Sequence, residues 1–173
     1  MKWRSITMVI AGLAVLTSAV LSINPGTPAA EAGASDERQT ERRTRAFVTA
    51  LEAKDQAAVV AMLDRNVELT VALSFSGEPE PAGRFAGETE VLGYLTGVFT
   101  NMAAIAFVDE RVSVTSDGRT SFLQATGDFT TADGRPYRNV YVFRLDWHEG
   151  RLVRIEEYGN PITYCQTFGD PDC

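Results

Sequence analysis

Histidine is almost absent from this 173-residue chain, and the single one, His148, stands in a Glu149-Gly150 turn signal where we expect it to be exposed. A lone exposed imidazole excludes Ser-His-Asp catalysis, Cys-His catalysis and histidine-based metal sites. The sequence also lacks both glycine-rich phosphate-binding patterns, G-x-G-x-x-G and G-x-x-x-x-G-K-[ST]. Any chemistry must therefore use carboxylates, phenols and amides, and we expect neither a metal nor a cofactor.

Basic residues are scarce as well, with 16 Lys and Arg against 23 Asp and Glu and a net charge of −7. Residues 1–34 contain Lys2, Arg4 and Glu31, so the rest of the chain holds 14 basic and 22 acidic residues and carries −8. An acidic domain is repelled by the phosphate backbones of DNA and RNA. We therefore expect no nucleic-acid partner.

Long hydrophobic runs are missing beyond residue 23, and the one such run covers the 18 residues 6–23. A basic start, Met1-Lys2-Trp3-Arg4, precedes it, and small residues in A-x-A order follow at positions 30–34. This order is typical of a secretory signal peptide, so we expect residues 1–34 to be removed and the protein to be secreted. The alternative is an uncleaved N-terminal membrane anchor, because 18 residues approach the length that spans a bilayer.

Cysteine occurs twice, at Cys165 and Cys173, both within the last nine residues. Export permits a disulfide, and Gly169 and Pro171 allow the short loop between the two residues to turn back. We expect this disulfide to tie down a C-terminal tail of residues 163–173. A metal site is the weaker alternative, since no histidine lies nearby.

The first half of the chain reads mainly as helices. Residues 24–36 have the composition of a linker, and apolar spacing predicts helices over 37–53, 56–63 and 88–101. Asp55 is suited to cap the second of these helices. We expect a turn at 64–66, a strand over 67–75 and a loop over 76–83.

Turn signals spaced 16 residues apart organise the second half: Asp117-Gly118, Asp133-Gly134 and Glu149-Gly150. Such pairs between runs of β-formers predict hairpins, because glycine adopts positive φ at no steric cost. Strands are expected over 104–116, 119–131, 136–147 and 151–158. Helices followed by an antiparallel meander indicate an α+β domain. Strands of this length curl, so the sheet and its helices could enclose a pocket.

The expected faces of these strands supply the candidate pocket residues. The third strand places Tyr137, Asn139, Tyr141 and Phe143 on one face, an aromatic wall with polar tips. A plain core with phenols at its rim is the alternative. The last strand turns Glu157 inward together with Val153 and Ile155. An inward carboxylate is either an acid or base with a raised pKa or half of a rim salt bridge. The second strand offers Gln124 and Asp128.

Several stretches of the chain resemble the SnoaL-like branch of the nuclear-transport-factor-2-like (NTF2-like) superfamily, which also holds ketosteroid isomerases. The stretches that carry the resemblance are Phe47-x-x-Ala50-Leu51-x-x-x-Asp55, Leu63-Asp-Arg-Asn-Val67, Phe85-Ala-Gly87 with Val91-x-x-Tyr94-Leu95, residues 133–143 and residues 150–161. The resemblance implies one domain over residues 35–162, shaped as a cone-like barrel with a pocket and commonly paired as a homodimer through the sheet. Asn139, Tyr141 and Glu157 match positions that often line the family's pockets.

Two classes of function remain open at this point. In the first, the pocket holds a small, largely apolar molecule, either by binding alone or with cyclase-, isomerase- or lyase-type chemistry. Glu157 would then be the acid or base, and Tyr141 with Asn139 would orient a carbonyl or stabilise an enolate. The remaining candidate ligand contacts are Tyr94, Gln124, Asp128, Tyr137 and Phe143. In the second, the chain is a non-catalytic interaction domain that uses its sheet face or its C-terminal tail.

Overall fold

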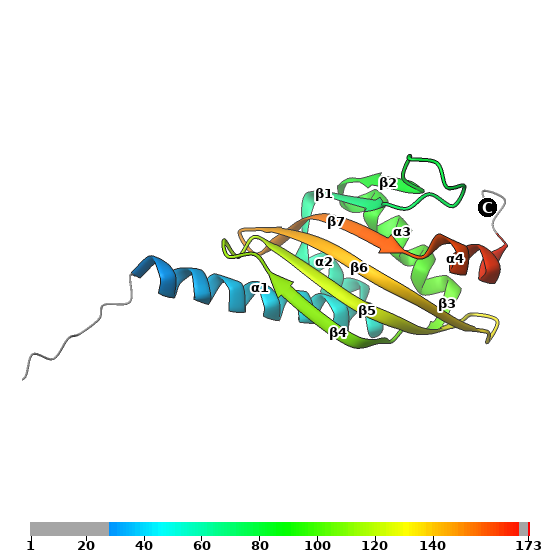
Figure 1. Ribbon diagram of the computed structural model, residues 1–173, viewed down its shortest axis with the longest axis horizontal. Coiled ribbons are helices and arrows are strands. Elements are labelled where there is room, and N and C mark those ends of the chain that lie inside the picture. Colours follow the sequence, from blue (N-terminus) through cyan, green and yellow to red (C-terminus); the bar gives the residue numbers. More distant parts are fainter. Residues whose placement is uncertain (1–27, 170–172) are drawn as a thin grey trace, which may run out of the picture.

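A computed structural model describes residues 28–169 and 173 (Figure 1). Its helices are α1 (Pro28–Glu52), α2 (Gln56–Met62), α3 (Gly87–Asn101) and α4 (Pro161–Phe168). Its strands are β1 (Leu63–Val71), β2 (Gly83–Ala86), β3 (Met102–Ala104), β4 (Phe107–Val114), β5 (Thr120–Thr131), β6 (Pro136–His148) and β7 (Arg151–Gly159). The chain is an α+β fold whose curled sheet is backed by helices, in agreement with the expected class.

The sheet has seven strands, in the order β2-β1-β7-β6-β5-β3, with β4 paired to β5. The expected meander is present, since β4, β5, β6 and β7 pair antiparallel to one another in sequence order. Outside the meander, β1 lies parallel to β7, so the sheet as a whole is mixed. Turn residues determine only the pairing of strands that a hairpin joins, whereas β1 and β7 are separated by most of the domain.

The three turn signals form tight turns, and Gly118, Gly134 and Gly150 have φ values of 67°, 84° and 81°. The expected strand over 104–116 is divided into β3 and β4, which pair with different parts of β5. A bulge follows in β4, where Asp109 has a φ of 55°. The break and the bulge let this edge of the sheet curl toward the helices.

Helix α1 begins at Pro28, nine residues before the expected start, so residues 28–36 of the expected linker are helical. The alanines of residues 29–34 favour helix, and proline is well tolerated in a first turn. Within the helix, the buried Thr40 donates a hydrogen bond to the carbonyl of Gly118, and the buried Thr44 hydroxyl lies 2.6 Å from that of Ser121. These contacts hold α1 against the β4–β5 hairpin.

Other boundaries also differ from expectation. Asp55 caps α2 as expected, accepting a hydrogen bond of 3.0 Å from the Ala58 amide. Strand β1 includes the expected turn at 64–66 and ends at Val71, before residues 72–75. The short strand β2 and the helix α4 were not expected. Asn160 caps α4, and Gly169 ends it in the left-handed conformation.

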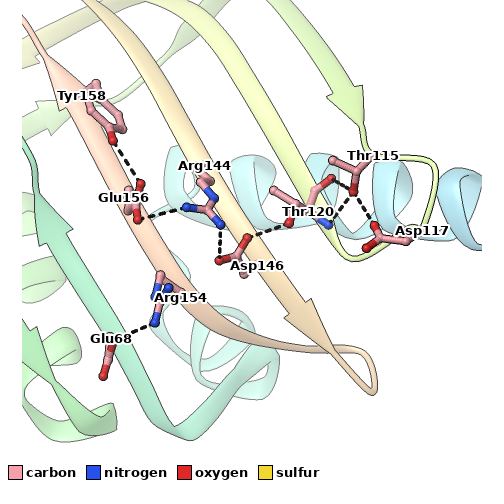
Figure 2. A network of polar contacts seen from close by, with 9 residues as sticks. All are labelled: Glu68, Thr115, Asp117, Thr120, Arg144, Asp146, Arg154, Glu156 and Tyr158. Carbon is pink, nitrogen blue, oxygen red and sulfur yellow. Dashed lines mark hydrogen bonds and ion pairs between the residues drawn. The ribbon is translucent and has the colours of Figure 1, made fainter.

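The two faces of the sheet differ in character. The face toward the helices carries the core, where Leu69, Leu123, Leu145, Leu152 and Ile155 are fully buried. The outer face carries a polar network (Figure 2), in which Arg144 pairs with Asp146 at 3.2 Å and with Glu156 at 3.3 Å. The network shows which β6 and β7 side chains point away from the core.

None of the helices over residues 28–169 is both long enough and apolar enough to cross a membrane. Of the signal peptide expected over residues 1–34, only residues 28–34 are described, and they lie in α1; residues 1–27, with the alternative anchor over residues 6–23, lie outside the described residues.

Candidate functional site

The inward face of β6 forms one wall of the site. Tyr137, Asn139, Tyr141 and Phe143 are all buried, with Asn139 only 4 % exposed, and they alternate with outward residues as expected. Across the hairpin on β5, Gly127 pairs with Asn139, and a side-chain Cβ at Gly127 would lie 2.7 Å from the ring of the neighbouring Tyr141. The Tyr141 ring can therefore occupy its place in the aromatic wall because β5 has a glycine, and so no side chain, at position 127.

Strand β7 brings Glu157 to the same interior. Phe143 pairs with Glu157 and Leu145 with Ile155, but Trp147 pairs with Leu152. Strand β7 therefore contains one extra residue, Val153, opposite the step from Asp146 to Trp147 of β6. The inward residues are consequently Leu152, Ile155 and Glu157. The expectation that Val153 faces inward with Ile155 is wrong, because this bulge shifts the alternation, while the expectation for Glu157 is met.

Two adjoining chambers lie between the sheet and the helices. The inner chamber, of about 110 Å³, is bounded by core side chains such as Leu51, Ile105 and Phe129. The outer chamber, of about 360 Å³, lies between α3, α4, β2 and residues 71–75, within the size range of small-molecule pockets. Residues that border both chambers are Tyr94, Val98, Met102, Tyr137, Tyr141, Glu157 and Tyr164.

Glu157 is the one acidic or basic residue among the described residues that line either chamber. The residue keeps some accessible surface where it borders the cavity, but protein surrounds its carboxyl group. This burial raises its pKa, and a 2.8 Å hydrogen bond from the Tyr94 hydroxyl lowers it in partial compensation. Burial and the neighbouring carboxylate together raise the pKa of Tyr94 well above its ordinary value. The carboxyl group is thus biased toward its neutral form.

A second polar group in the cavity joins Tyr137, Asn139 and Tyr141. The Asn139 side-chain amide donates to the Tyr137 hydroxyl at 2.7 Å, and the Tyr141 hydroxyl donates to the same oxygen at 3.4 Å. Burial raises the pKa of both phenols. Tyr137 accepts twice here, and no hydrogen bond in the described part of the chain uses its own proton. Tyr137 can therefore donate to a molecule in the cavity.

Asn139 itself is fully occupied by protein partners. Besides Tyr137, its amide nitrogen donates to the carbonyl of Asn160 at 3.2 Å. Its oxygen accepts from the backbone amides of Val140 at 2.8 Å and Asn160 at 3.1 Å. A primary amide has two donors and two lone pairs, so this side chain has no capacity left for a ligand. Asn139 borders the outer chamber as expected, but it holds Tyr137 and the start of α4 in place.

Gln124 and Asp128 do not line the cavity. Both side chains lie on the outer face of β5, where Asp128 forms an ion pair with Arg138. The inward residues of β5 are the odd-numbered ones, from Ser121 to Thr131. The expectation for Gln124 and Asp128 is wrong because it assigned the polar face to the pocket, whereas the interior here takes small and apolar residues. His148 is exposed, as expected.

Helix α4 contributes cavity residues that the sequence analysis missed. Tyr164 stacks on Phe75 with ring centroids 4.4 Å apart, and Phe168 lies edge-on to Tyr137 at 5.3 Å. Tyr164 and Phe168 fall within the expected C-terminal tail of residues 163–173, although Asn160-Pro161 and Gly169 are recognisable helix-capping signals. The expected disulfide joins Cys165 to Cys173, with their Cα atoms 5.6 Å apart. The disulfide ties the middle of α4 to Cys173.

Comparisons with known proteins agree with this architecture. The model of the SnoaL-like domain family matches residues 44–155. The uncharacterized protein YesE of Bacillus subtilis (strain 168) is 24% identical over 126 residues, which cover 72% of this chain and 84% of YesE.

Solved structures show the same fold. A proposed isomerase from Bacillus subtilis has a TM-score of 0.66 and 22% identity, covering 78% of this chain and 95% of its own. A proposed polyketide cyclase from Xanthomonas campestris pv. campestris has a TM-score of 0.63 and 16% identity, and the match covers 75% of this chain and 96% of the cyclase chain. A proposed ketosteroid isomerase from Kribbella flavida DSM 17836 has a TM-score of 0.54 and 19% identity, covering 72% and 80%. Similarity at this level establishes the fold and leaves the chemistry to the residues of the cavity.

Proposed function

The chain belongs to the SnoaL-like domain family of the NTF2-like superfamily, and from this premise we propose that its cavity binds a small, largely apolar molecule on which Glu157 performs acid–base chemistry. The isomerase and cyclase descriptions of its structural neighbours agree with this class of reaction. The observation that carries the proposal is the environment of Glu157.

A carboxyl group with no basic partner in an apolar cavity costs stability, so its presence calls for a reason. Its raised pKa makes Glu157 a better base, when ionised, than an ordinary surface glutamate, and lets it hold a proton closer to neutral pH. The hydrogen bond from Tyr94 fixes the orientation of one carboxylate oxygen, Oε2. Oε1 is then the atom that would take a proton from a bound molecule.

Tyr137 is the donor best suited to the oxygen of that molecule, in place of the Tyr141 expected from the sequence. The Tyr137 oxygen accepts hydrogen bonds from Asn139 and Tyr141, and these bonds stabilise the ionised form of Tyr137. The neutral Tyr137 hydroxyl is therefore a stronger hydrogen-bond donor. In the proposed step, Glu157 removes a proton from a carbon next to a carbonyl. The C–H electron pair forms the enolate, whose oxygen receives the Tyr137 hydrogen bond, and Glu157 then returns the proton.

Hydrogen–deuterium exchange of simple ketones tests this proposal without knowledge of the natural substrate. Acetophenone would be incubated with the protein in D₂O near neutral pH, and deuterium in its methyl group would be followed by NMR. We expect exchange above the buffer rate, and we expect Glu157→Gln to reduce the catalysed part by about 10²–10⁴-fold, the usual contribution of a positioned acid or base.

Glu156→Gln is the matched control for this experiment. Glu156 is the adjacent residue, but its side chain lies on the outer face, where it contacts Arg144 and accepts a 3.0 Å hydrogen bond from Tyr158 (Figure 2). This variant should exchange acetophenone like the wild type. Equal exchange by wild type and Glu157→Gln would refute the catalytic role of Glu157.

A binding protein without turnover is the second candidate. It is favoured by the shortage of ionisable partners, because no acidic or basic side chain besides Glu157 lines either chamber within the described residues. Native mass spectrometry of the purified protein would report a retained small molecule. Retention by both wild type and Glu157→Gln, without exchange of any ketone, would select this candidate.

We also propose that the protein acts outside the cytoplasm and forms a homodimer through the sheet. The apolar run over residues 6–23 and the Cys165–Cys173 disulfide support export. Exposed apolar side chains on the outer sheet face, including Val140 at 60 % and Phe122 at 37 %, support pairing. Mass spectrometry of the exported protein would report both the mature N-terminus and the oligomeric state.

A further inference from the structure

Two glycines in the middle of α3, Gly93 and Gly97, have no structural explanation within the fold. A Cβ added at either would meet no atom within 4 Å, and neither residue has a positive φ. Glycine in a helix interior is less favourable than alanine because it gives up more backbone freedom on folding. Gly127 shows the contrast, since its missing side chain makes room for Tyr141. Packing therefore does not require Gly93 or Gly97.

Both glycines instead border the outer chamber. They are four residues apart and so lie on the same side of α3, and both line this chamber while lining no part of the inner one. Tyr94 and Val98, one position further along, border both chambers. Both glycines are exposed and have open space at the Cβ position, so larger side chains at 93 and 97 would take up part of the outer chamber that they line. Glycine at 93 and 97 thus makes α3 less stable than alanine would, and it leaves the outer chamber open.

The inner chamber is smaller and more apolar. Its volume of about 110 Å³ is somewhat below that of an apolar cavity of about 150 Å³ known to hold benzene. Its walls are aliphatic and aromatic, apart from Glu157 and the phenols at the border with the outer chamber. Its size limits it to one compact apolar group no larger than a single ring. The polar atoms of a ligand must then lie at the border, beside Glu157 and Tyr137.

From these observations we propose that the ligand is an uncharged two-part molecule that spans both chambers. A compact ring lies in the inner chamber, a carbonyl lies at the border, and a longer apolar body lies in the outer chamber along Gly93 and Gly97. An anionic ligand is disfavoured because no basic side chain of the described lining would offset its charge beside Glu157. This inference rests on the proposed function and assigns the substrate class of the same site.

A series of phenyl alkyl ketones tests the inference, because these molecules place a carbonyl between one ring and a chain of adjustable length. Binding of acetophenone through hexanophenone would be measured by titration calorimetry. Each methylene buried in the outer chamber should tighten binding by about fourfold. A tert-butyl group on the ring should weaken binding by at least tenfold, because the inner chamber has no room for it. Affinity independent of chain length would overturn the inference.

Substitutions on α3 locate the chain of the ketone. Gly93→Leu/Gly97→Leu should weaken hexanophenone binding at least tenfold and leave acetophenone within twofold. Thr100→Leu, at an exposed α3 position outside both chambers, is the matched control and should change neither. Gly93→Ala/Gly97→Ala should raise the melting temperature by a few degrees, because alanine favours helix. Equal weakening of both ketones, or a lower melting temperature of the alanine variant, would overturn the inference.

The outcomes separate this inference from the proposed function. Chain-length dependence that disappears in the leucine variant, without Glu157-dependent exchange of acetophenone, would support the ligand class and refute the catalysis. Glu157-dependent exchange with no chain-length dependence would support the catalysis and refute the two-part ligand.

Discussion

Replacing Glu157 by glutamine should make the protein more stable at neutral and alkaline pH. The carboxylate has up to four hydrogen-bonding sites on its oxygens, and Tyr94 fills one of them. Its ionised form in this cavity is therefore under-solvated relative to water. Glutamine keeps an oxygen for the Tyr94 hydroxyl and removes the charge, so the penalty that the wild type carries when ionised disappears. We expect a gain of about 1–3 kcal/mol in the free energy of unfolding at pH 8.

The pH dependence gives the sharper test, because its sign follows from the raised pKa of Glu157. Below the ordinary value of 4.5 the carboxyl is protonated in both the folded and the unfolded chain. Above 4.5 the unfolded chain releases the proton while the folded chain keeps it. Wild-type stability should then fall by at most about 1.4 kcal/mol per pH unit, until the pH passes the folded pKa and the loss levels off.

Urea unfolding of wild type and Glu157→Gln between pH 4 and pH 9 measures this effect. Contributions that are common to both proteins cancel in the difference between their free energies of unfolding. The difference at pH 4 reports the fixed cost of the glutamine amide, and its growth with pH reports the carboxylate alone. A difference that stays constant across this range, or that grows in favour of the wild type, would refute the account of Glu157.

Three further changes test other contacts. Tyr94→Phe removes the hydrogen bond that lowers the pKa of Glu157. The stability of this variant should therefore level off at a higher pH than that of the wild type, and an equal or lower pH in the same titration would contradict this. Lys54→Met removes hydrogen bonds of 3.2 and 2.8 Å to two carbonyls at the end of α3 and should cost about 1–3 kcal/mol in urea unfolding, whereas an unchanged midpoint would show that these bonds contribute nothing. Gly127→Ala should cost about 1–3 kcal/mol through the clash with Tyr141, and wild-type stability in this variant would contradict the observed packing.

The parts of the fold that were predictable from the sequence are those with local causes. Asp55 and the three hairpin turns act through their immediate neighbours, and strict alternation along β6 identified the inward face that includes Tyr141. Glu157 was placed correctly because the alternation from Ile155 onward is regular, although the bulge before it was not recognised.

The parts that were missed depend on contacts between distant segments. On β5 the large Phe122 and the polar Gln124 share the outer face, while small residues such as Gly127 face inward beneath the rings of β6. Residue polarity alone therefore indicates the wrong face. The parallel pairing of β1 with β7 and the stacking of Phe75 on Tyr164 likewise follow from the assembled fold. Of these missed features, only the capping residues of α4, Asn160 and Gly169, could be recognised from the sequence.

The bulge in β7 has a consequence for how this strand tolerates changes in length. A one-residue deletion normally exchanges the two faces of a strand beyond the deletion. Leu152 and Ile155 both point inward only because the strand absorbs one surplus residue between them. If Val153 were lost, plain alternation would still turn Leu152, Ile155 and Glu157 to the interior. At this position β7 could therefore lose one residue and still direct Glu157 into the cavity.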